Sequence, residues 1–308
     1  MKHKYSNFIF KLIKLCCLGF CVLFAKTTLA QKNNHTIASL INADKYFLKL
    51  IASKGINAGF KKMADAKAVT FKPGPVSLKS YYPNYGNNSN IYSWQTATAI
   101  LAKSGDFGIT TGPYVDSRKE TADLLYGNYI SVWRSDERNN WKLMLHADVP
   151  SPKLDTVAET KIMVPYNEKY SKLLGPKKIK MREDIVFSTD DLLGKTLSLT
   201  GNINLKEFYS SNVTLYMAGY QPIQGIEEIF PFLSAQKISI VSKPLNTNRA
   251  YSGDLAYTYG KATLTINQQK TPYSYVRIWQ IQPDMKWYII MDAYMPLTPT
   301  EPSLAAKR

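Results

Sequence analysis

Apolar residues recur at spacings of three and four over residues 37–51, which predicts an amphipathic helix. Its apolar face consists of Ile37, Leu40, Ile41, Phe47, Leu48 and Ile51. We expect Gly55 to end this helix, because glycine is favoured just past a helix end. A second, short helix is expected over residues 58–63.

A similar helical pattern returns later in the chain. Ser188 or Thr189 is expected to cap it, because a short hydroxyl side chain satisfies the first free amide groups of a helix. The expected helix carries Leu192, Leu193 and Leu197 and ends at Gly201.

After the first helices the pattern changes to β-rich runs separated by turn residues, over residues 96–102, 107–114, 128–134 and 141–147. Residues 135–140 and 282–284 are typical of hairpin connections, which join antiparallel neighbours. Helices followed by antiparallel strands predict an α+β fold with the helices on one face of a curved sheet.

The chain matches itself in several blocks. The segment S-G-D-F-G-I-T-T-G from Ser104 corresponds to S-G-D-L-A-Y-T-Y-G from Ser252, and the strands that begin at Tyr129 and Trp141 correspond to those at Tyr275 and Trp287. The offset is 148 residues for the first block and 146 for the other two. Residues 69–71 match residues 213–215. Ordered blocks at a nearly constant offset predict two copies of one domain.

Each predicted strand has two apolar faces. Tyr129, Ser131 and Trp133 point to one side, whereas Ile130 and Val132 point to the other. A sheet that is apolar on both faces must be covered on both. Helices and a cavity cover one face of each sheet. We therefore expect each domain to cover the remaining face of the other domain's sheet, so that the chain forms an intramolecular pseudo-dimer.

The first thirty residues predict an export signal. They are basic, contain no acidic residue, and carry an apolar stretch over residues 15–25 that is short for a membrane span. Thr28-Leu29-Ala30 is a small-x-small pattern that a signal peptidase accepts. An uncleaved anchor is the alternative. We expect an exported protein, periplasmic or secreted, with no stable membrane insertion once the signal is removed.

Removal of this segment changes the composition. It contains all three cysteines, so the mature chain would have no disulfide, thiolate metal site or cysteine nucleophile. It also contains five lysines, so the formal net charge falls from +16 to about +11. The basic residues are scattered, and the densest run, over residues 177–182, suits a solvated linker better than a nucleic-acid site. We therefore expect no nucleic acid as a partner.

The predicted organisation has five segments. Residues 1–30 are the signal peptide, residues 31–150 and 186–300 are the two domains, residues 151–185 are a linker, and residues 301–308 are a tail. The linker is expected to carry one helix around residues 166–174.

The order of elements and motifs resembles the nuclear transport factor 2-like superfamily. The motifs are S-G-D-x-G-x-T-x-G, Y-x-x-x-W and a final W-x-x-x-x-(D)-x-x-x-P, with F-x-P-G-P beginning at Phe71. Within it, the chain is most similar to small bacterial domains of unknown function related to ketosteroid isomerase and polyketide cyclase. The resemblance implies two cone-shaped domains, each a curved antiparallel sheet wrapped on N-terminal helices around an apolar cavity. The second half departs from P-G-P at residues 217–219, and His146 stands where the branch usually has an aspartate.

His146 and Asp292 are the candidate catalytic residues. His146 and Asp148 lie two apart on one strand, hence on one face, and a neutral histidine near a carboxylate can act as a general base. Asp292 shares a face with Tyr288 and Tyr294, and burial in an apolar cone would raise its pKa. The competing interpretations are a polar pair at an exposed strand end and a structural carboxylate.

The candidate ligand-binding residues are Trp94, Tyr114, Asp148, Tyr259, Arg277 and Tyr294. Trp94 is expected near a pocket mouth. Arg277 either holds an anionic ligand group or stacks where the domains meet. Asp106 and Asp254 are expected to form turns by bonding to their own backbone. The strand glycines at 108, 112 and 260 either permit a strong bend or leave floor space for a ligand.

Other chemistries lack support in the sequence. Beyond the leader, His35 and His146 are the histidines, too few for most histidine metal sites, and no phosphate loop or G-x-S-x-G motif occurs. We expect no metal and no cofactor. The first hypothesis is a protein that binds a small apolar or anionic ligand, or a protein partner, without catalysis. The alternative is an isomerase, cyclase or dehydratase that uses an acid–base residue in an apolar cone.

Overall fold

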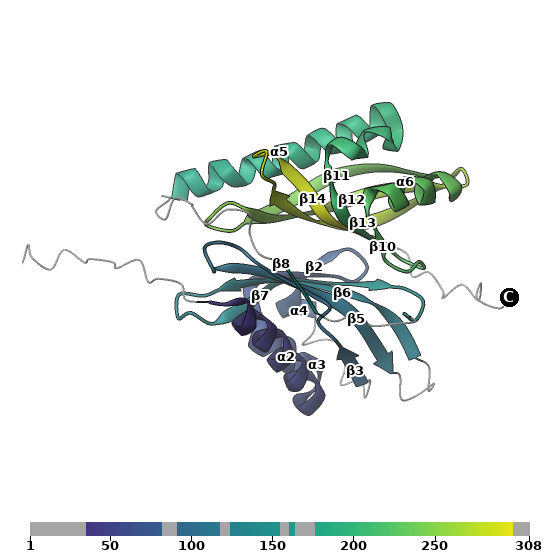
Figure 1. Cartoon of the computed structure of the whole chain (residues 1–308). Coiled ribbons are helices and arrows are strands. Elements are labelled where there is room, and N and C mark those ends of the chain that lie inside the picture. Colours follow the sequence, from purple (N-terminus) through teal and green to yellow (C-terminus); the bar gives the residue numbers. More distant parts are fainter. Residues whose placement is uncertain (1–34, 82–90, 118–123, 155–159, 164–175, 298–308) are drawn as a thin grey trace, which may run out of the picture. The chain divides into compact units, whose positions relative to one another are not determined.

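The computed structural model describes residues 35–81, 91–117, 124–154, 160–163 and 176–297. The first half opens with helices and continues in strands (Figure 1). Its elements are α2 (Ile37–Lys54), α3 (Ile56–Met63), β1 (Ala64–Phe71), β2 (Pro75–Ser77), α4 (Leu78–Tyr81), β3 (Ile91–Trp94), β4 (Thr98–Leu101), β5 (Phe107–Ser117), β6 (Leu124–Ser135), β7 (Trp141–Pro150) and β8 (Lys161–Met163).

The second half follows a similar order. Its elements are α5 (Pro176–Thr200), the 3-10 helix η2 (Gly201–Glu207), β9 (Tyr209–Met217), β10 (Ile223–Gln224), α6 (Ile226–Ala235), β11 (Ile238–Arg249), β12 (Leu255–Ile266), β13 (Gln269–Ile281) and β14 (Trp287–Pro296).

The strands form two sheets. The first has the order β2-β1-β7-β6-β5-β4-β8, with β3 paired to β5, and the second has the order β10-β9-β14-β13-β12-β11. The hairpin-linked strands are antiparallel, as predicted. The first long strand of each sheet pairs parallel with the last one, β1 with β7 and β9 with β14. The α+β fold class is confirmed, and these parallel pairs are an addition to it.

The first helix forms as its pattern predicts. Thr36 caps α2 by accepting from the Ser39 amide, and Ser39 in turn accepts from the Thr36 amide. The helix buries Leu40, Phe47 and Ile51 and ends at Gly55, whose φ of 86° few other residues adopt readily.

The expected start of the later helix was wrong. α5 begins at Pro176, so Ser188 and Thr189 lie inside it, and the Thr189 hydroxyl donates to the Ile185 carbonyl. Residues 177–187 contain good helix formers and no glycine or proline, so nothing in them stops the helix. The basic run 177–182 lies in these first turns. The linker helix expected around residues 166–174 falls outside the described residues.

The β1 and β9 strands show that the match of residues 69–71 to residues 213–215 is shifted by one residue. Both strands begin with one burial pattern, which aligns Ala64 with Tyr209. Val69 lies opposite Leu145, and Thr214 lies opposite Met291. Val69 therefore corresponds to Thr214 and not to Val213.

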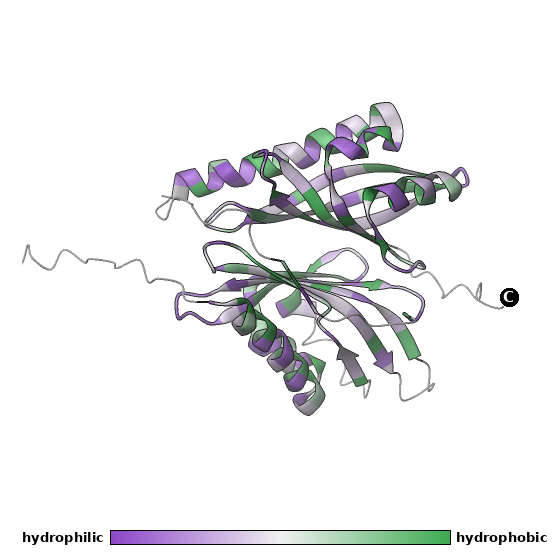
Figure 2. Cartoon of the chain, in the orientation of Figure 1, coloured by the Kyte–Doolittle hydropathy of each residue, from purple (hydrophilic) through white to green (hydrophobic). Residues whose placement is uncertain are grey.

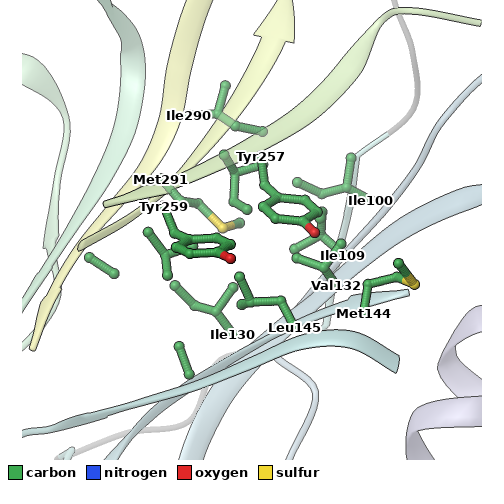
Figure 3. Close-up of a cluster of buried hydrophobic side chains, with 14 of the residues drawn as sticks. Ile100, Ile109, Ile130, Val132, Met144, Leu145, Tyr257, Tyr259, Ile290 and Met291 are labelled. Carbon is green, nitrogen blue, oxygen red and sulfur yellow. The ribbon is translucent and has the colours of Figure 1, made fainter. Parts of the chain in front are cut away.

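Each long strand divides its side chains between two clusters. Ile130 and Val132 belong to a hydrophobic cluster with residues from both sheets, including Tyr257, Tyr259 and Met291 (Figure 3). Tyr129 and Trp133 pack instead with α2 residues such as Phe47. The predicted division of strand faces is therefore correct. Figure 2 shows strongly hydrophobic positions mixed with paler, less hydrophobic ones along the strands.

None of the helices in the described ranges is long and apolar enough to span a membrane.

Candidate functional site

Most of the predicted site residues lie on the helix-facing side of their sheets. His146 and Asp148 lie on β7, Trp94 lies on β3, and Tyr114 lies on β5. In the second half, Asp292 and Tyr294 lie on β14, and Arg277 lies on β13. Tyr259 is the exception, because it lies in the cluster that contains residues of both sheets. Apart from Tyr259, the predicted residues thus fall into one group in each half.

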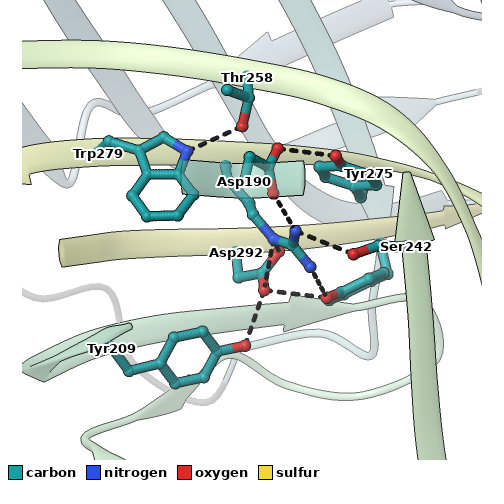
Figure 4. A network of polar contacts seen from close by, with 9 residues as sticks. Asp190, Tyr209, Ser242, Thr258, Tyr275, Trp279 and Asp292 are labelled. Carbon is teal, nitrogen blue, oxygen red and sulfur yellow. Dashed lines mark hydrogen bonds and ion pairs between the residues drawn. The ribbon is translucent and has the colours of Figure 1, made fainter. Parts of the chain in front are cut away.

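In the second half, Arg277 is the centre of a buried polar network. Its Nη1 donates to Asp190 and, at 3.1 Å, to the Ser242 hydroxyl, and its Nε lies 3.2 Å from Asp292 Oδ2. Its Nη2 donates to the Tyr294 hydroxyl at 2.9 Å. Each guanidinium nitrogen therefore has a partner within the protein. Figure 4 shows Asp190 and Asp292 with the groups around them.

Tyrosines complete this network. Tyr209 and Tyr294 donate to Asp292 Oδ2 at 2.7 and 2.9 Å, and Tyr275 donates to Asp190 Oδ2 at 2.7 Å (Figure 4). The guanidinium also lies over the Tyr275 ring, 4.3 Å from its centre. Arg277, Asp190 and Asp292 are all fully buried. The arginine side chain therefore occupies the interior between the helices and the sheet in this half.

The charges of this network constrain one another. Burial opposes the charge of Arg277, but Asp292 and Asp190 outweigh it, so the pKa of Arg277 is raised further. Burial raises the pKa of Asp292, and Arg277 and the tyrosine hydroxyls oppose that rise. Two carboxylates thus share one permanent cation.

In the first half, Asp44 accepts hydrogen bonds from neutral donors. Tyr129, Thr96 and Trp94 donate to its Oδ2 at 2.6, 2.7 and 3.2 Å, and Thr110 donates to its Oδ1 at 3.1 Å. Burial raises its pKa, and these hydrogen bonds oppose the rise. Sequence analysis missed Asp44. The available signal was an acidic residue between Leu40 and Phe47 on the apolar stripe of a helix.

His146 lies in a chain of polar contacts that leads toward the surface. Its Nδ1 is 2.9 Å from the buried Ser131 hydroxyl, and its Nε2 is 3.2 Å from Asp148 Oδ1. Asp148 also accepts from Tyr92 at 2.6 Å and from Lys72 at 3.0 Å. Since the Lys72 side chain is 33% exposed and that of His146 only 1%, the chain connects solvent with the interior.

The environment keeps Asp148 ionised. Burial opposes its charge, but Lys72 and the contacts with His146 and Tyr92 outweigh this effect and hold the pKa of Asp148 well below its usual range. A fixed negative charge therefore lies beside His146.

Aromatic rings surround these polar groups. The rings of Phe60 and Phe47 lie edge-on to that of His146, with centres 5.3 and 6.0 Å away. Nearer Asp148, the Tyr92 ring lies 5.2 Å from the Tyr114 ring and 5.5 Å from that of Trp94. The first half thus combines an aromatic lining with His146 and Asp148.

The expected position of Tyr288 beside Asp292 was wrong. The β13–β14 register shifts between Ile278 and Trp279, which puts one extra residue of β14 before Met291. The alternation of faces is broken there, and Tyr288 donates to Asp284 in the adjacent turn at 2.8 Å.

The S-G-D turns bond to each other as well as to their own backbone. Each serine amide donates to the other turn's serine hydroxyl, from Ser104 at 3.2 Å and from Ser252 at 3.0 Å. Asp254 accepts from the Lys103 amide, and Asp106 accepts from the Tyr251 amide. The two turns are thus bonded reciprocally, although each aspartate also accepts from its own serine.

The strand glycines allow neighbouring backbones to approach closely. A Cβ on Gly112 would lie 1.9 Å from the Gln95 carbonyl oxygen, and one on Gly260 would lie 2.2 Å from the Lys243 carbonyl oxygen. Gly260 pairs with Pro244 at a register shift of β11. The glycines therefore permit the bend of the sheet. Neighbouring backbone segments of the same chain occupy the space beside them that a ligand could otherwise have used.

Among the described residues, no group of three or more His, Cys, Asp or Glu side chains could hold a metal ion. No protein-family model and no curated protein matches the sequence.

Solved structures resemble parts of the chain at low identity. A nuclear transport factor 2-like superfamily protein from Salmonella enterica serovar Typhimurium is 11% identical over 40% of this chain and 95% of its own, with a TM-score of 0.31. The CaMKII hub of S. rosetta is 20% identical over 37% and 95%, with a TM-score of 0.31. A candidate ketosteroid isomerase from Parabacteroides distasonis is 14% identical over 42% and 96%, with a TM-score of 0.30.

Proposed function

We propose that this chain is an exported tandem protein of the nuclear transport factor 2-like kind, whose first half binds a small ligand without catalysis. The second half is a closed scaffold. The contrast between Ser131 and Arg277 carries this proposal. They occupy corresponding positions of β6 and β13, opposite His146 and Asp292. An arginine fills the second site, whereas the first has a short serine and a polar chain that reaches solvent.

The residues near Lys72 suggest the chemistry of the ligand. Tyr92, Trp94 and Tyr114 offer ring faces and edges to an apolar or aromatic body. Lys72 is a partly exposed cation that can receive an anionic or hydrogen-bonding group. We therefore propose a small, largely apolar ligand with one such group.

The two halves are proposed to be copies that form an intramolecular pseudo-dimer. The reciprocal bonds between the S-G-D turns support this, because each turn gives the other the same contacts. The hydrophobic cluster with residues of both sheets supports it as well. In this arrangement the second half would stabilise the first without a ligand site of its own.

Acid–base catalysis is the second candidate. His146 lies between a hydroxyl and an ionised carboxylate, the arrangement in which an orienting acid assists a general base. In such a reaction His146 Nδ1 would accept the Ser131 hydroxyl proton as that hydroxyl takes the proton of the substrate, and Asp148 would stabilise the resulting imidazolium. An isomerase, cyclase or dehydratase would need this step.

Direct binding tests the first candidate. We expect 2-naphthoate, which joins an aromatic body to a carboxylate, to bind saturably and to change tryptophan fluorescence. Lys72→Ala should weaken binding about tenfold, since one charge-assisted contact contributes roughly 1.5 kcal/mol. Lys180→Ala, which removes an exposed lysine paired with Asp184, should leave it unchanged. No saturable binding of naphthoate or neutral 2-naphthol, together with no co-purifying compound in native mass spectrometry, would reject the proposal.

Incubation of the protein with a bound compound separates binding from catalysis. A non-catalytic protein returns the compound unchanged. If the wild type converts the compound and His146→Gln does not, the result would favour the catalytic function instead.

A further inference from the structure

Helix α5 is apolar on two faces. Its inner face buries Val186, Leu193 and Leu197. Its outer face exposes Met181, Ile185, Leu192 and Leu199 to 60, 50, 55 and 84%. A helix that covers one sheet needs a single apolar stripe, and among the described residues the outer stripe of α5 is left exposed.

Three of these exposed residues form a straight line. Ile185, Leu192 and Leu199 are seven residues apart, which is close to two helical turns, so they lie above one another on one side of α5. Hydrophobic positions lie among polar ones along this helix in Figure 2. An apolar line along one side of a helix gives a second helix a narrow surface to pack against.

The charges beside this line favour a helix as partner over a lipid surface. A helix that lies on a membrane carries mainly lysine and arginine on its polar face. α5 instead has both signs on its outer turns, paired as Lys180–Asp184 and Asp191–Lys195. A mixed rim around a narrow apolar line suits a protein interface.

We infer that the line Ile185–Leu192–Leu199 is a self-association surface, on which α5 of a second copy lies antiparallel. The spacing is symmetric about Leu192, so a two-fold axis there brings Leu192 against its own copy and Ile185 against the partner's Leu199. Lys177 and Lys178 lie in the first turn of α5 and would lie near the C-terminal end of the partner's α5. The carbonyl end of that helix favours cations there, and the exposed Lys206 and Glu207 that follow it offset each other.

This inference is independent of the proposed ligand site, which lies in the other half. Its first test is the mass of protein expressed from the full-length sequence, measured by sedimentation across a concentration series. We expect a reversible dimer. Leu192→Glu should weaken it at least tenfold, because each interface then holds two facing carboxylates. Leu245→Glu, at an exposed leucine of β11, should not change it. A monomer at every concentration, or a dimer insensitive to Leu192→Glu, would overturn the inference.

Cysteine substitutions test the direction of pairing. Leu192→Cys alone should form a disulfide-linked dimer under mild oxidation. Ile185→Cys and Leu199→Cys should each cross-link poorly alone and efficiently when mixed. Unsubstituted protein, oxidised in parallel, controls for the leader cysteines. Efficient cross-linking of Ile185→Cys with itself would indicate parallel helices and contradict the two-fold at Leu192. Monomeric protein that binds anionic phosphatidylglycerol vesicles through Leu192 would also overturn the inference, in favour of a membrane surface.

Discussion

Asp44 and Asp190 lie at corresponding positions of the first helix of each half, but a cation partners only Asp190 within the described structure. Each accepts from a tyrosine 85 residues later in the chain, Tyr129 for Asp44 and Tyr275 for Asp190. The remaining donors to Asp44 are neutral, whereas Asp190 is paired with Arg277. Where the first half has Ser131, the second has Arg277 on the facing strand, and this arginine gives Asp190 a cationic partner that Asp44 does not have within the described structure.

Removing Arg277 is expected to destabilise the second half strongly. In Arg277→Met, two buried carboxylates lose their shared cation, and leaving such groups unpaired costs about 3–5 kcal/mol. The free energy of unfolding in urea measures the effect. Arg138→Ala, at an exposed turn, is the control and should stay within about 0.5 kcal/mol of wild type. A loss below about 1 kcal/mol in Arg277→Met would mean that the arginine is not the centre of this half.

The ion pair of Asp148 is expected to make stability depend on acid pH. Its folded pKa lies below the unfolded value near 4, so its contribution is present above about pH 4 and is lost as the pH falls below that. Asp148→Asn removes the titrating group. The stability difference between wild type and Asp148→Asn should therefore shrink by more than about 1 kcal/mol from pH 6 to pH 3.

Asp184→Asn serves as the control for this pH series, because its carboxylate is exposed on α5. Its difference from wild type should change little with pH. A constant difference between wild type and Asp148→Asn would show that the carboxylate is not held ionised by its neighbours.

Local patterns predicted the elements, and tertiary contacts decided the sites. The period of apolar residues located α2 and the strand faces around Ile130 and Val132, because period is a property of neighbouring residues. The partners of Arg277 could not be predicted in this way. Asp190 is 87 residues away on a helix, and their contact depends on how that helix lies on the sheet.

Register shifts account for other differences from the sequence analysis. A bulge before Met291 separated Tyr288 from Asp292, although simple alternation puts them on one face. Asp44 was missed for a different reason. An acid on an apolar stripe is usually at its edge, and its burial here depends on Tyr129 and Thr96, which are distant in sequence.

The S-G-D turns are expected to be coupled energetically across the two halves. Ser104→Ala and Ser252→Ala should each cost about 1–3 kcal/mol, because each leaves the other turn's amide without its acceptor. The two hydroxyls are 2.8 Å apart, so the double substitution should cost less than the sum of the single ones by about 0.5 kcal/mol or more. Additive effects in this double-mutant cycle would mean that the turns act separately. Ser198→Ala, at an exposed position of α5, is the control.

Gly112 and Gly260 are expected to reject even a methyl group. Alanine at either position would bring its Cβ to within 1.9 or 2.2 Å of a carbonyl oxygen on a neighbouring backbone segment, and backbone cannot move aside as a flexible side chain does. Overpacking of this kind costs about 1–3 kcal/mol. Thermal unfolding of Gly112→Ala and Gly260→Ala should show this loss. Gly74→Ala is the matched control, because its Cβ would meet only a Leu297 methyl at 3.8 Å. If all three variants unfolded at the wild-type temperature, the strands would have room at these positions, and the space considered for a ligand would become available again.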